Sequence, residues 1–135
     1  MRIRAAGKSD FAGIRALASR YDLDYDDMEA DRFWMAVEEG RVAGICGLKK
    51  HPDCLELCSL AVDESCRGRG WGRRLVSSLL RASRGDVYLT TVNPAYFEAL
   101  GFRYAAGVPA SMDKDPEWCL GCNRARCRVM VKQKQ

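Results

Sequence analysis

The stretch that decides the fold runs from Leu57 to Leu80 and has Arg67-Gly68-Arg69-Gly70-Trp71-Gly72 at its centre. Residues 54–62 before this centre predict a strand, and apolar residues recur at helical spacing over residues 75–80 after it. Three alternate glycines at such a junction allow tight backbone geometry and the close approach of a ligand to the main chain. The stretch therefore predicts a glycine-rich turn that links a strand to a helix.

This turn is typical of an anion-binding site. The unpaired amides in the first turn of the following helix, together with the positive end of its dipole, form a cradle in which pyrophosphate is the natural occupant. A Walker loop is excluded because Gly72 is followed by Arg73 and Arg74 instead of Lys and Ser or Thr. The dinucleotide fingerprint is excluded because the glycines follow a G-x-G-x-G pattern. A tight strand–helix connection that binds no ligand is the alternative.

The rest of the chain is predicted to form a mixture of strands and helices. An acidic N-cap, Asp10, precedes a helical face over residues 11–18, and Tyr21–Ala30 is either a short helix or a loop. Residues 108–121 predict a loop because they are rich in Pro, Asp and Gly. Further helices are predicted at 70–83 and 94–100, and strands at 1–6, 33–37, 42–48, 54–62, 86–92, 102–104 and 126–132, with turns at 39–41 and 51–53.

Length and composition favour a single soluble domain over residues 1–135. The chain is 47% hydrophobic and 30% charged, which is a globular composition. It has no apolar run of the roughly 18 residues that a membrane helix needs, and no signal-peptide pattern at its start. We therefore expect a cytoplasmic protein without a membrane partner. The single histidine, His51, excludes multi-histidine metal sites.

The net charge of +4 is too small to indicate nucleic-acid binding by itself, but the charges are segregated. Residues 22–39 are acidic with Arg32 as their only base, and residues 67–84 carry arginines without an acid. These segments are either two solvated faces or an anion site and a rim that attracts cations. The arginines fall in and around the glycine-rich turn with only Trp71 as an aromatic neighbour, so no nucleic-acid partner is expected.

The sequence resembles the GCN5-related N-acetyltransferase (GNAT) family. The family signature is Gln/Arg-x-x-Gly-x-Gly/Ala, and here Arg67–Gly72 is preceded by Leu60-Ala61-Val62 and followed by Leu75. Asn93 and the stretch from Tyr96 to Phe102 follow in family order, so the resemblance covers nearly the whole chain. It implies an α/β (α+β) fold, with a mixed, mainly antiparallel sheet of six to seven strands, about four flanking helices and splayed middle strands.

The resemblance also implies that acetyl-CoA is the cosubstrate. Backbone amides from Arg67 to Arg73 would hold the CoA pyrophosphate, the strand before them would pair with the pantetheine arm, and Asn93 would lie beside that arm. The implied cofactor-binding residues are Leu60, Ala61, Val62, Arg67, Gly68, Arg69, Gly70, Trp71, Gly72, Arg73 and Asn93.

Glu56 is the first candidate for the catalytic base. It stands eleven residues before Arg67, where the histone-acetylating branch of the family carries its glutamate. Strand alternation predicts that Glu56, Cys58, Leu60 and Val62 share one face, which is the face of the implied pantetheine contacts. An ordinary exposed strand glutamate is the alternative.

The group that protonates the departing thiolate is less well defined. Many family members carry a tyrosine at the position of Phe97 here, so neighbouring Tyr96 is the candidate acid and Tyr88 the second. A tyrosine packed at the helix edge is the alternative. Cys58 is disfavoured as an acetylated nucleophile because no histidine is nearby in the sequence.

The chain has seven cysteines, and because this number is odd, a disulfide framework cannot account for all of them. Cys119, Cys122 and Cys127 have a spacing compatible with zinc, but a fourth ligand would have to come from far away in the sequence. Buried reduced thiols, or an adventitious Cys119–Cys122 disulfide, are the alternatives, so we name the three cysteines only as a candidate zinc site and assign no metal ligand.

Residues 87–102 are similar to the branch of the family that acetylates the α-amine of amino acids or their analogues, and the family often uses the region of residues 21–33 in the acceptor site. We therefore predict direct acetyl transfer from acetyl-CoA to a small primary amine in a ternary complex. The alternatives are a protein or peptide amine as the acceptor, and a non-catalytic acyl-CoA-binding or metal-responsive module on the same fold. A homodimer is left open.

Overall fold

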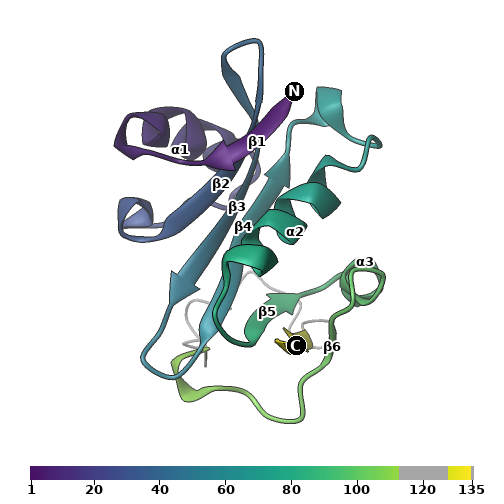
Figure 1. Cartoon of the computed structure of the whole chain (residues 1–135). Helices are drawn as coiled ribbons and strands as arrows, with labels where there is room; N and C mark the ends of the chain where they lie inside the picture. Colours follow the sequence, from purple (N-terminus) through teal and green to yellow (C-terminus); the bar gives the residue numbers. More distant parts are fainter. Residues whose placement is uncertain (113–127, 135) are drawn as a thin grey trace. The chain divides into compact units, whose positions relative to one another are not determined.

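The computed structural model describes residues 1–112 and 128–134, and these form a seven-stranded mixed sheet with three α-helices (Figure 1). The strand order is β1-β2-β3-β4-β5-β7-β6. The strands are β1 (Arg2–Ala5), β2 (Arg32–Glu38), β3 (Arg41–Lys50), β4 (Leu55–Val62), β5 (Val87–Thr91), β6 (Arg103–Tyr104) and β7 (Arg128–Lys132). The helices are α1 (Phe11–Arg20), α2 (Trp71–Ala82) and α3 (Pro94–Glu98).

The predicted fold class and strand number are confirmed, and the helix count is lower than expected. The described residues contain three α-helices instead of about four. The region of residues 21–30 forms only a 3-10 turn, Met28–Ala30. Asp22 and Asp27 take positive φ angles of 57° and 61°, a conformation that cannot continue a right-handed helix.

Residue contacts divide the chain into two compact units. The first comprises Met1–Lys49 and Leu57–Ser83, and the second comprises Lys50–Glu56 and Arg84–Gln135. Strand β4 therefore contributes Leu55 and Glu56 to the second unit and its remaining residues to the first. The single domain over 1–135 stays a prediction.

In the first unit, α1 packs its apolar stripe into the core. Phe11, Ile14 and Leu17 are buried with Phe33 and Ile45 of the strands, which confirms the predicted helical face. Asp10 is the N-cap residue of α1, as predicted, but its side chain does not cap the helix. The Asp10 carboxylate makes no cap to α1 and accepts the Gly7 amide at 2.7 Å and the Arg4 guanidinium at 2.9 Å instead.

In the first unit, a tight turn joins the antiparallel strands β2 and β3, and helix α2 packs closely against β3. The turn between β2 and β3 places Glu39 and Gly40 at φ 52° and 76°, as a two-residue hairpin turn of type I′ does. Leu75, Val76 and Leu79 bury one face of α2. A Cβ at Gly44 on β3 would lie 3.0 Å from the Leu75 side chain, so the missing side chain allows the helix to approach closely.

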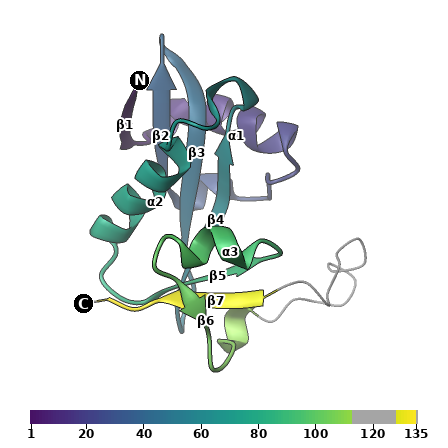
Figure 2. The same ribbon diagram turned by 90° about the vertical axis from the view of Figure 1, so that its right-hand side faces the viewer.

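The second unit is built on β5, β7 and β6, which lie side by side with α3 (Figure 2). Strand β5 pairs antiparallel with β7 over five residue pairs and parallel with β4 through Leu55↔Val87 and Glu56↔Tyr88. On α3, Phe97 is buried with its ring centroid 5.7 Å from that of Phe102. The predicted closing strand is confirmed from residue 128 onward; residues 126 and 127 lie outside the described part. Within the described residues, no helix has the length and apolar character needed to span a membrane.

Candidate functional site

The glycine-rich turn of the first unit has the geometry of an anion cradle. Gly68 and Gly70 both have φ at +81°, a conformation that L side chains rarely adopt, and a Cβ built on either residue meets nothing within 4 Å. Backbone conformation, and not crowding, therefore requires glycine here, and the surface of the turn is open to a ligand. Gly70 is the N-cap residue of α2 and has no side chain with which to cap the amides of the first helical turn.

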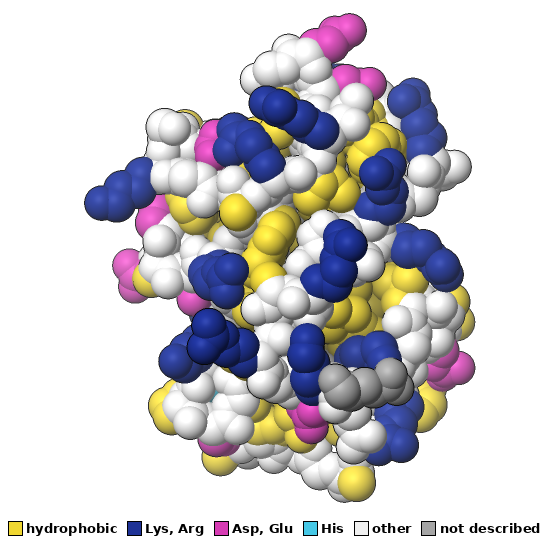
Figure 3. Space-filling view, in the orientation of Figure 1, with side chains coloured by type: hydrophobic (Ala, Val, Ile, Leu, Met, Phe, Trp, Pro, Cys, Tyr) yellow, Lys and Arg dark blue, Asp and Glu magenta, His cyan; other side chains and the backbone are white. Residues whose placement is uncertain are grey.

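Two arginines of this turn, Arg67 and Arg69, make local contacts that order their side chains. Arg67 donates from Nε to the Val62 carbonyl at 3.0 Å, and its guanidinium lies 4.8 Å from the Tyr21 ring centre. Arg69 donates to the Ser65 carbonyl at 3.4 Å and lies 3.9 Å from the Glu38 carboxylate. Lys and Arg side chains gather over the face that carries α2 (Figure 3). The turn therefore combines the amides at the start of α2 with the positive charge that a pyrophosphate needs.

Asp63 links the segment just before the glycine-rich turn to other parts of the first unit through hydrogen bonds. Its buried carboxylate accepts the Ser65 amide at 3.1 Å and the guanidinium groups of Arg20 at 2.9 Å and Arg41 at 3.4 Å. The Ser65 amide and the Arg20 guanidinium lower the pKa of Asp63 below its usual value, because both stabilise the ionised form. The ionised carboxylate thus holds the backbone just before Arg67.

Strand β4 carries a backbone irregularity that the sequence did not reveal. Ser59 has φ at 51°, and its hydroxyl donates to the Leu23 carbonyl at 2.7 Å. A residue with positive φ inside a strand breaks the alternation of side chains. The predicted common face of Glu56, Cys58, Leu60 and Val62 is therefore wrong beyond Ser59.

The packing on both sides of Ser59 supports this correction. The Cys58 sulfur lies 2.9 Å from a Cβ built on Gly47, whereas Ala61 packs in the same core cluster as Ile45. Gly47 and Ile45 are two residues apart on β3, so they lie on the same face of the sheet. Cys58 and Ala61 contact this same face although they are three residues apart, a spacing that regular alternation would place on opposite faces. The irregularity interrupts the strand at the residues that the family resemblance assigns to the pantetheine contact.

The acidic segment contacts β4 through Tyr25. The Tyr25 hydroxyl donates to the Asp31 carboxylate at 2.7 Å and lies 3.5 Å from the Cys58 sulfur. The Lys49 ammonium lies 4.2 Å from the Tyr25 ring centre. Burial and the nearby thiol raise the pKa of Tyr25 far above its usual value, so the hydroxyl stays protonated. The acidic segment is thus partly folded onto the strand, and no sequence pattern indicated this contact.

Glu56, in the second unit, is buried rather than exposed, so the alternative of an ordinary exposed glutamate is wrong. Its residue is 7% exposed, and its Oε1 atom lies 2.7 Å from Nε2 of His51. The turn between β3 and β4 is closed by the His51 amide donating to the Cys54 carbonyl at 2.9 Å. The predicted turn at residues 51–53 was the signal that could have revealed this pair, because the flanking strands place residues 51 and 56 close together.

The other predicted catalytic and pantetheine residues of the second unit lie around α3. Asn93 is the N-cap residue of α3, and its amide donates to the Thr91 hydroxyl at 2.9 Å. The Tyr96 ring packs edge-on against Phe97 with a centroid distance of 5.0 Å, and 37% of the residue is exposed. This packing agrees with the alternative of a tyrosine packed at the helix edge, and the role of Tyr96 as the acid stays a prediction.

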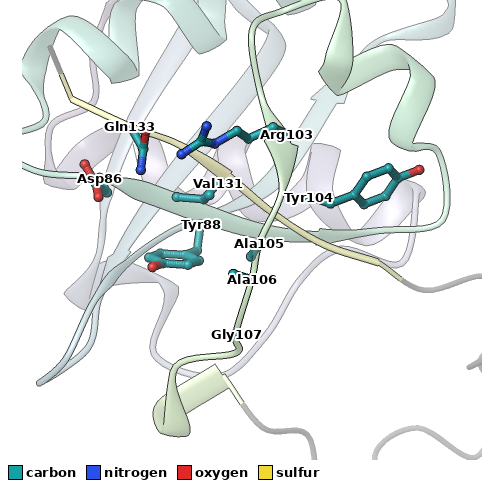
Figure 4. Close-up of a pocket in the computed structure, with 9 residues that line it drawn as sticks. All are labelled: Asp86, Tyr88, Arg103, Tyr104, Ala105, Ala106, Gly107, Val131 and Gln133. Carbon is teal, nitrogen blue, oxygen red and sulfur yellow. The ribbon is translucent and has the colours of Figure 1, made fainter.

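The second unit also contains a pocket of about 310 Å³ (Figure 4). Its polar lining comes from Asp86, Tyr88, Arg103 and Gln133, and Val131 contributes an apolar wall. The sequence singled out only Tyr88 among these residues. The segment of residues 104–107 forms the rest of the wall.

The metal prediction concerns residues that the structure does not describe. Cys119, Cys122 and Cys127 lie outside residues 1–112 and 128–134. Among the residues that are described, no group of three His, Cys, Asp or Glu side chains is arranged to hold a metal ion.

Solved structures with the same fold include acetyltransferases that hold CoA. N-acetylglutamate synthase from Neisseria gonorrhoeae, complexed with coenzyme A and N-acetyl-glutamate, has a TM-score of 0.78 at 20% identity over 99% of this chain. The chain spans 35% of the length of that synthase. Rv2747 from Mycobacterium tuberculosis, in complex with CoA and NLQ, has a TM-score of 0.76 at 22% identity over the full length of both chains.

A third similar structure is YhbS from Escherichia coli, a GNAT family N-acetyltransferase in complex with CoA. It has a TM-score of 0.70 at 23% identity and covers 98% of this chain and 80% of its own. No curated protein sequence matches the chain significantly. The profile of the acetyltransferase (GNAT) family matches residues 7–102, which include the glycine-rich turn and Glu56. The chain therefore belongs to the GNAT family of acetyltransferases.

Proposed function

We propose that this protein is a cytoplasmic, acetyl-CoA-dependent N-acetyltransferase that acts on a primary amine of a small molecule, such as an amino acid or an analogue. The observation that carries the proposal is buried Glu56 near the start of β4, hydrogen-bonded to His51 of the preceding turn. Strand β4 precedes the glycine-rich turn along the chain. The amides of that turn and the start of α2 suit the CoA pyrophosphate. N-acetyl-glutamate in the gonococcal synthase supports an amino acid as the acceptor.

The proposed reaction gives each residue a defined task. Glu56 accepts the proton that the attacking amine must lose, because only a neutral nitrogen has a lone pair to donate. The amine nitrogen bonds to the thioester carbonyl carbon, the carbon–sulfur bond breaks, and the thiolate leaves. Tyr96 is the proposed donor of a proton to that thiolate. His51 holds the Glu56 carboxylate in one orientation through the 2.7 Å hydrogen bond.

The test is the release of free thiol from acetyl-CoA across a panel of amines. The panel contains amino acids, diamines and short peptides with a free amino terminus, and CoA binding is measured in parallel by calorimetry. We expect thiol release with small amines and a matching acetylated product by mass spectrometry. CoA binding without thiol release for any amine would overturn the enzyme proposal and favour a non-catalytic module, and activity on peptides alone would overturn the small-molecule acceptor.

A further inference from the structure

The register of the second unit aligns Glu56 with the pocket. Glu56 is paired with Tyr88, Tyr88 with Val131, and Val131 with Arg103. Residues directly opposite each other on neighbouring strands project from the same face of a sheet. Glu56 and the pocket-lining side chains of Tyr88, Val131 and Arg103 therefore lie on one face, and Tyr88 is both a neighbour of Glu56 and part of the pocket wall.

Two polar side chains of the pocket make no hydrogen bond within the described part of the chain. Among the described residues, neither the Arg103 guanidinium nor the Gln133 amide side chain makes a hydrogen bond or an ion pair. Arg103 extends from β6 toward Val131 and Gln133, and Asp86 lies beside Gln133 (Figure 4). Asp86 accepts the Lys134 backbone amide at 2.8 Å. Within the described part of the chain, no ion pair joins Asp86 to Arg103, so an anion-binding group and a cation-binding group line the same pocket separately.

These two charges match the head group of an α-amino acid. A guanidinium binds a carboxylate through two parallel hydrogen bonds, and a carboxylate such as Asp86 binds an ammonium group. Ligand pockets range from roughly 300 to 1,000 Å³, and this pocket of about 310 Å³ is at the small end of that range. Its size and charges therefore favour a small zwitterion over a large cofactor or a peptide.

Asp86 and Glu56 are two separate carboxylates on this side of the sheet. Glu56 is not among the residues that line the pocket, and Asp86 lies two residues before Tyr88 along the chain. With neighbouring strands about 4.8 Å apart and a rise of about 3.3 Å per residue, Asp86 and Glu56 are separated by roughly 8 Å at the backbone. An aliphatic side chain of three or four methylenes that joins two amines has a length comparable to this separation.

We propose that the pocket binds the head group of an acceptor that is an α-amino acid with a second, distal primary amine, and that the distal amine is the one acetylated. This inference rests on the proposed function. The α-carboxylate binds Arg103, the α-ammonium binds Asp86, and the distal nitrogen loses its proton to Glu56 as its bond to the acetyl carbon forms and the thiolate leaves. The acceptor class thus differs from the α-amine expected from the sequence.

A panel of three amine types tests this assignment. Lysine and ornithine carry both the head group and a distal amine, cadaverine and putrescine lack the α-carboxylate, and alanine and glutamate lack the distal amine. We expect kcat/KM for the diamino acids to exceed that of both other types by about tenfold or more, since a charge-assisted hydrogen bond contributes about 1.5–3 kcal/mol. Equal or faster acetylation of alanine or glutamate would overturn the inference while leaving the proposed function intact.

Variants and a binding measurement separate the two proposals. Arg103→Gln and Asp86→Asn should raise KM for lysine about tenfold, while Arg2→Gln, an exposed arginine of β1, should not. Calorimetric titration of lysine into the protein gives a readout that does not require acetyl transfer. Lysine binding that Arg103→Gln abolishes would support the pocket even if no amine released thiol. Acetylation of other amines without any binding or acetylation of lysine would refute it.

Discussion

Glu56 and His51 form the contact on which the chemistry depends. Both side chains are largely buried, with 10% and 17% of their surfaces exposed, and 2.7 Å separates Oε1 from Nε2. A buried carboxylate costs free energy unless it is hydrogen-bonded, so the imidazole stabilises the charge and restricts the rotation of the carboxylate. We therefore treat His51 as a positioning residue for Glu56.

Substitution of His51 tests this role. His51→Gln keeps a side-chain N–H donor and His51→Phe removes it, so the phenylalanine variant should lose more activity. A hydrogen bond to a charged group is worth about 1.5–3 kcal/mol, which corresponds to a loss in kcat of roughly 10- to 100-fold for His51→Phe. The KM for acetyl-CoA should not change. Equal losses in the two variants, or a change confined to KM, would contradict the positioning role.

The glycine-rich turn is the element whose local geometry matters most. Gly70→Ala places a side chain at φ +81° without any steric neighbour, so the expected cost is conformational and about 1–2 kcal/mol. Urea denaturation measures this loss, and calorimetry should show weaker CoA binding because the amides at the start of α2 move. Gly85→Ala is the matched control, since a Cβ there also meets nothing within 4 Å and its φ is not positive. Identical stabilities for the two variants would contradict the strain assigned to Gly70.

The segment that enters the turn depends on the ionisation of Asp63. Its pKa is lowered in the folded protein by the Ser65 amide and by Arg20, so its contribution to stability is present above the ordinary value of about 3.9. That contribution is lost as the pH falls through the lowered folded pKa. Asp63→Asn should therefore lower the melting temperature at neutral pH, and the difference from the wild type should shrink as the pH drops below about 4.

Exposed Asp26 provides a control for this measurement. Asp26→Asn should leave the melting temperature close to that of the wild type across the same pH range. A difference between Asp63→Asn and the wild type that stays constant down to the lowest pH would show that the carboxylate charge is not what orders the segment. Weaker CoA binding by Asp63→Asn is expected as well, because Asp63 holds the backbone before Arg67.

At the scale of the whole molecule, charge is distributed unevenly. The net charge is only +4, but arginines without any acid occupy residues 67–84. CoA carries phosphates, so its affinity should fall as salt rises, with most of the change occurring as the Debye length shortens from about 30 Å at 0.01 M to about 8 Å at 0.15 M. Arg73→Gln should flatten this dependence and Arg2→Gln should not. A CoA dissociation constant that is independent of salt would contradict an arginine-based phosphate site.

Local features of the fold were predictable from the sequence. The glycine-rich turn, the hairpin turn at residues 39–40 and the buried faces of α1 and α2 depend on neighbouring residues, whose spacing the sequence displays directly. The position of Glu56 on a strand followed in the same way from the strand pattern of residues 54–62. Such local patterns predict which helix or strand a residue belongs to and where along it the residue lies.

Features that depend on distant residues were not predictable. Ser59 bonds to Leu23 across 36 positions and Asp63 bonds to Arg20 across 43, so neither the strand irregularity nor the anchored turn has a local signature. The pocket depends on the register of β7 against β5 and β6, which no periodicity determines. Its charged residues, Asp86 and Arg103, appear in the sequence as ordinary surface residues.

The central claim is that Glu56 is the base for acetyl transfer to an amine. The most direct measurement is the initial rate of thiol release by the wild type and by Glu56→Gln at saturating acetyl-CoA and amine, with exposed Glu39→Gln as the matched control. We predict a loss in kcat of about 10²–10⁴ for Glu56→Gln, with an unchanged CoA dissociation constant and an unaffected control. A kcat for Glu56→Gln equal to that of the wild type would contradict the account.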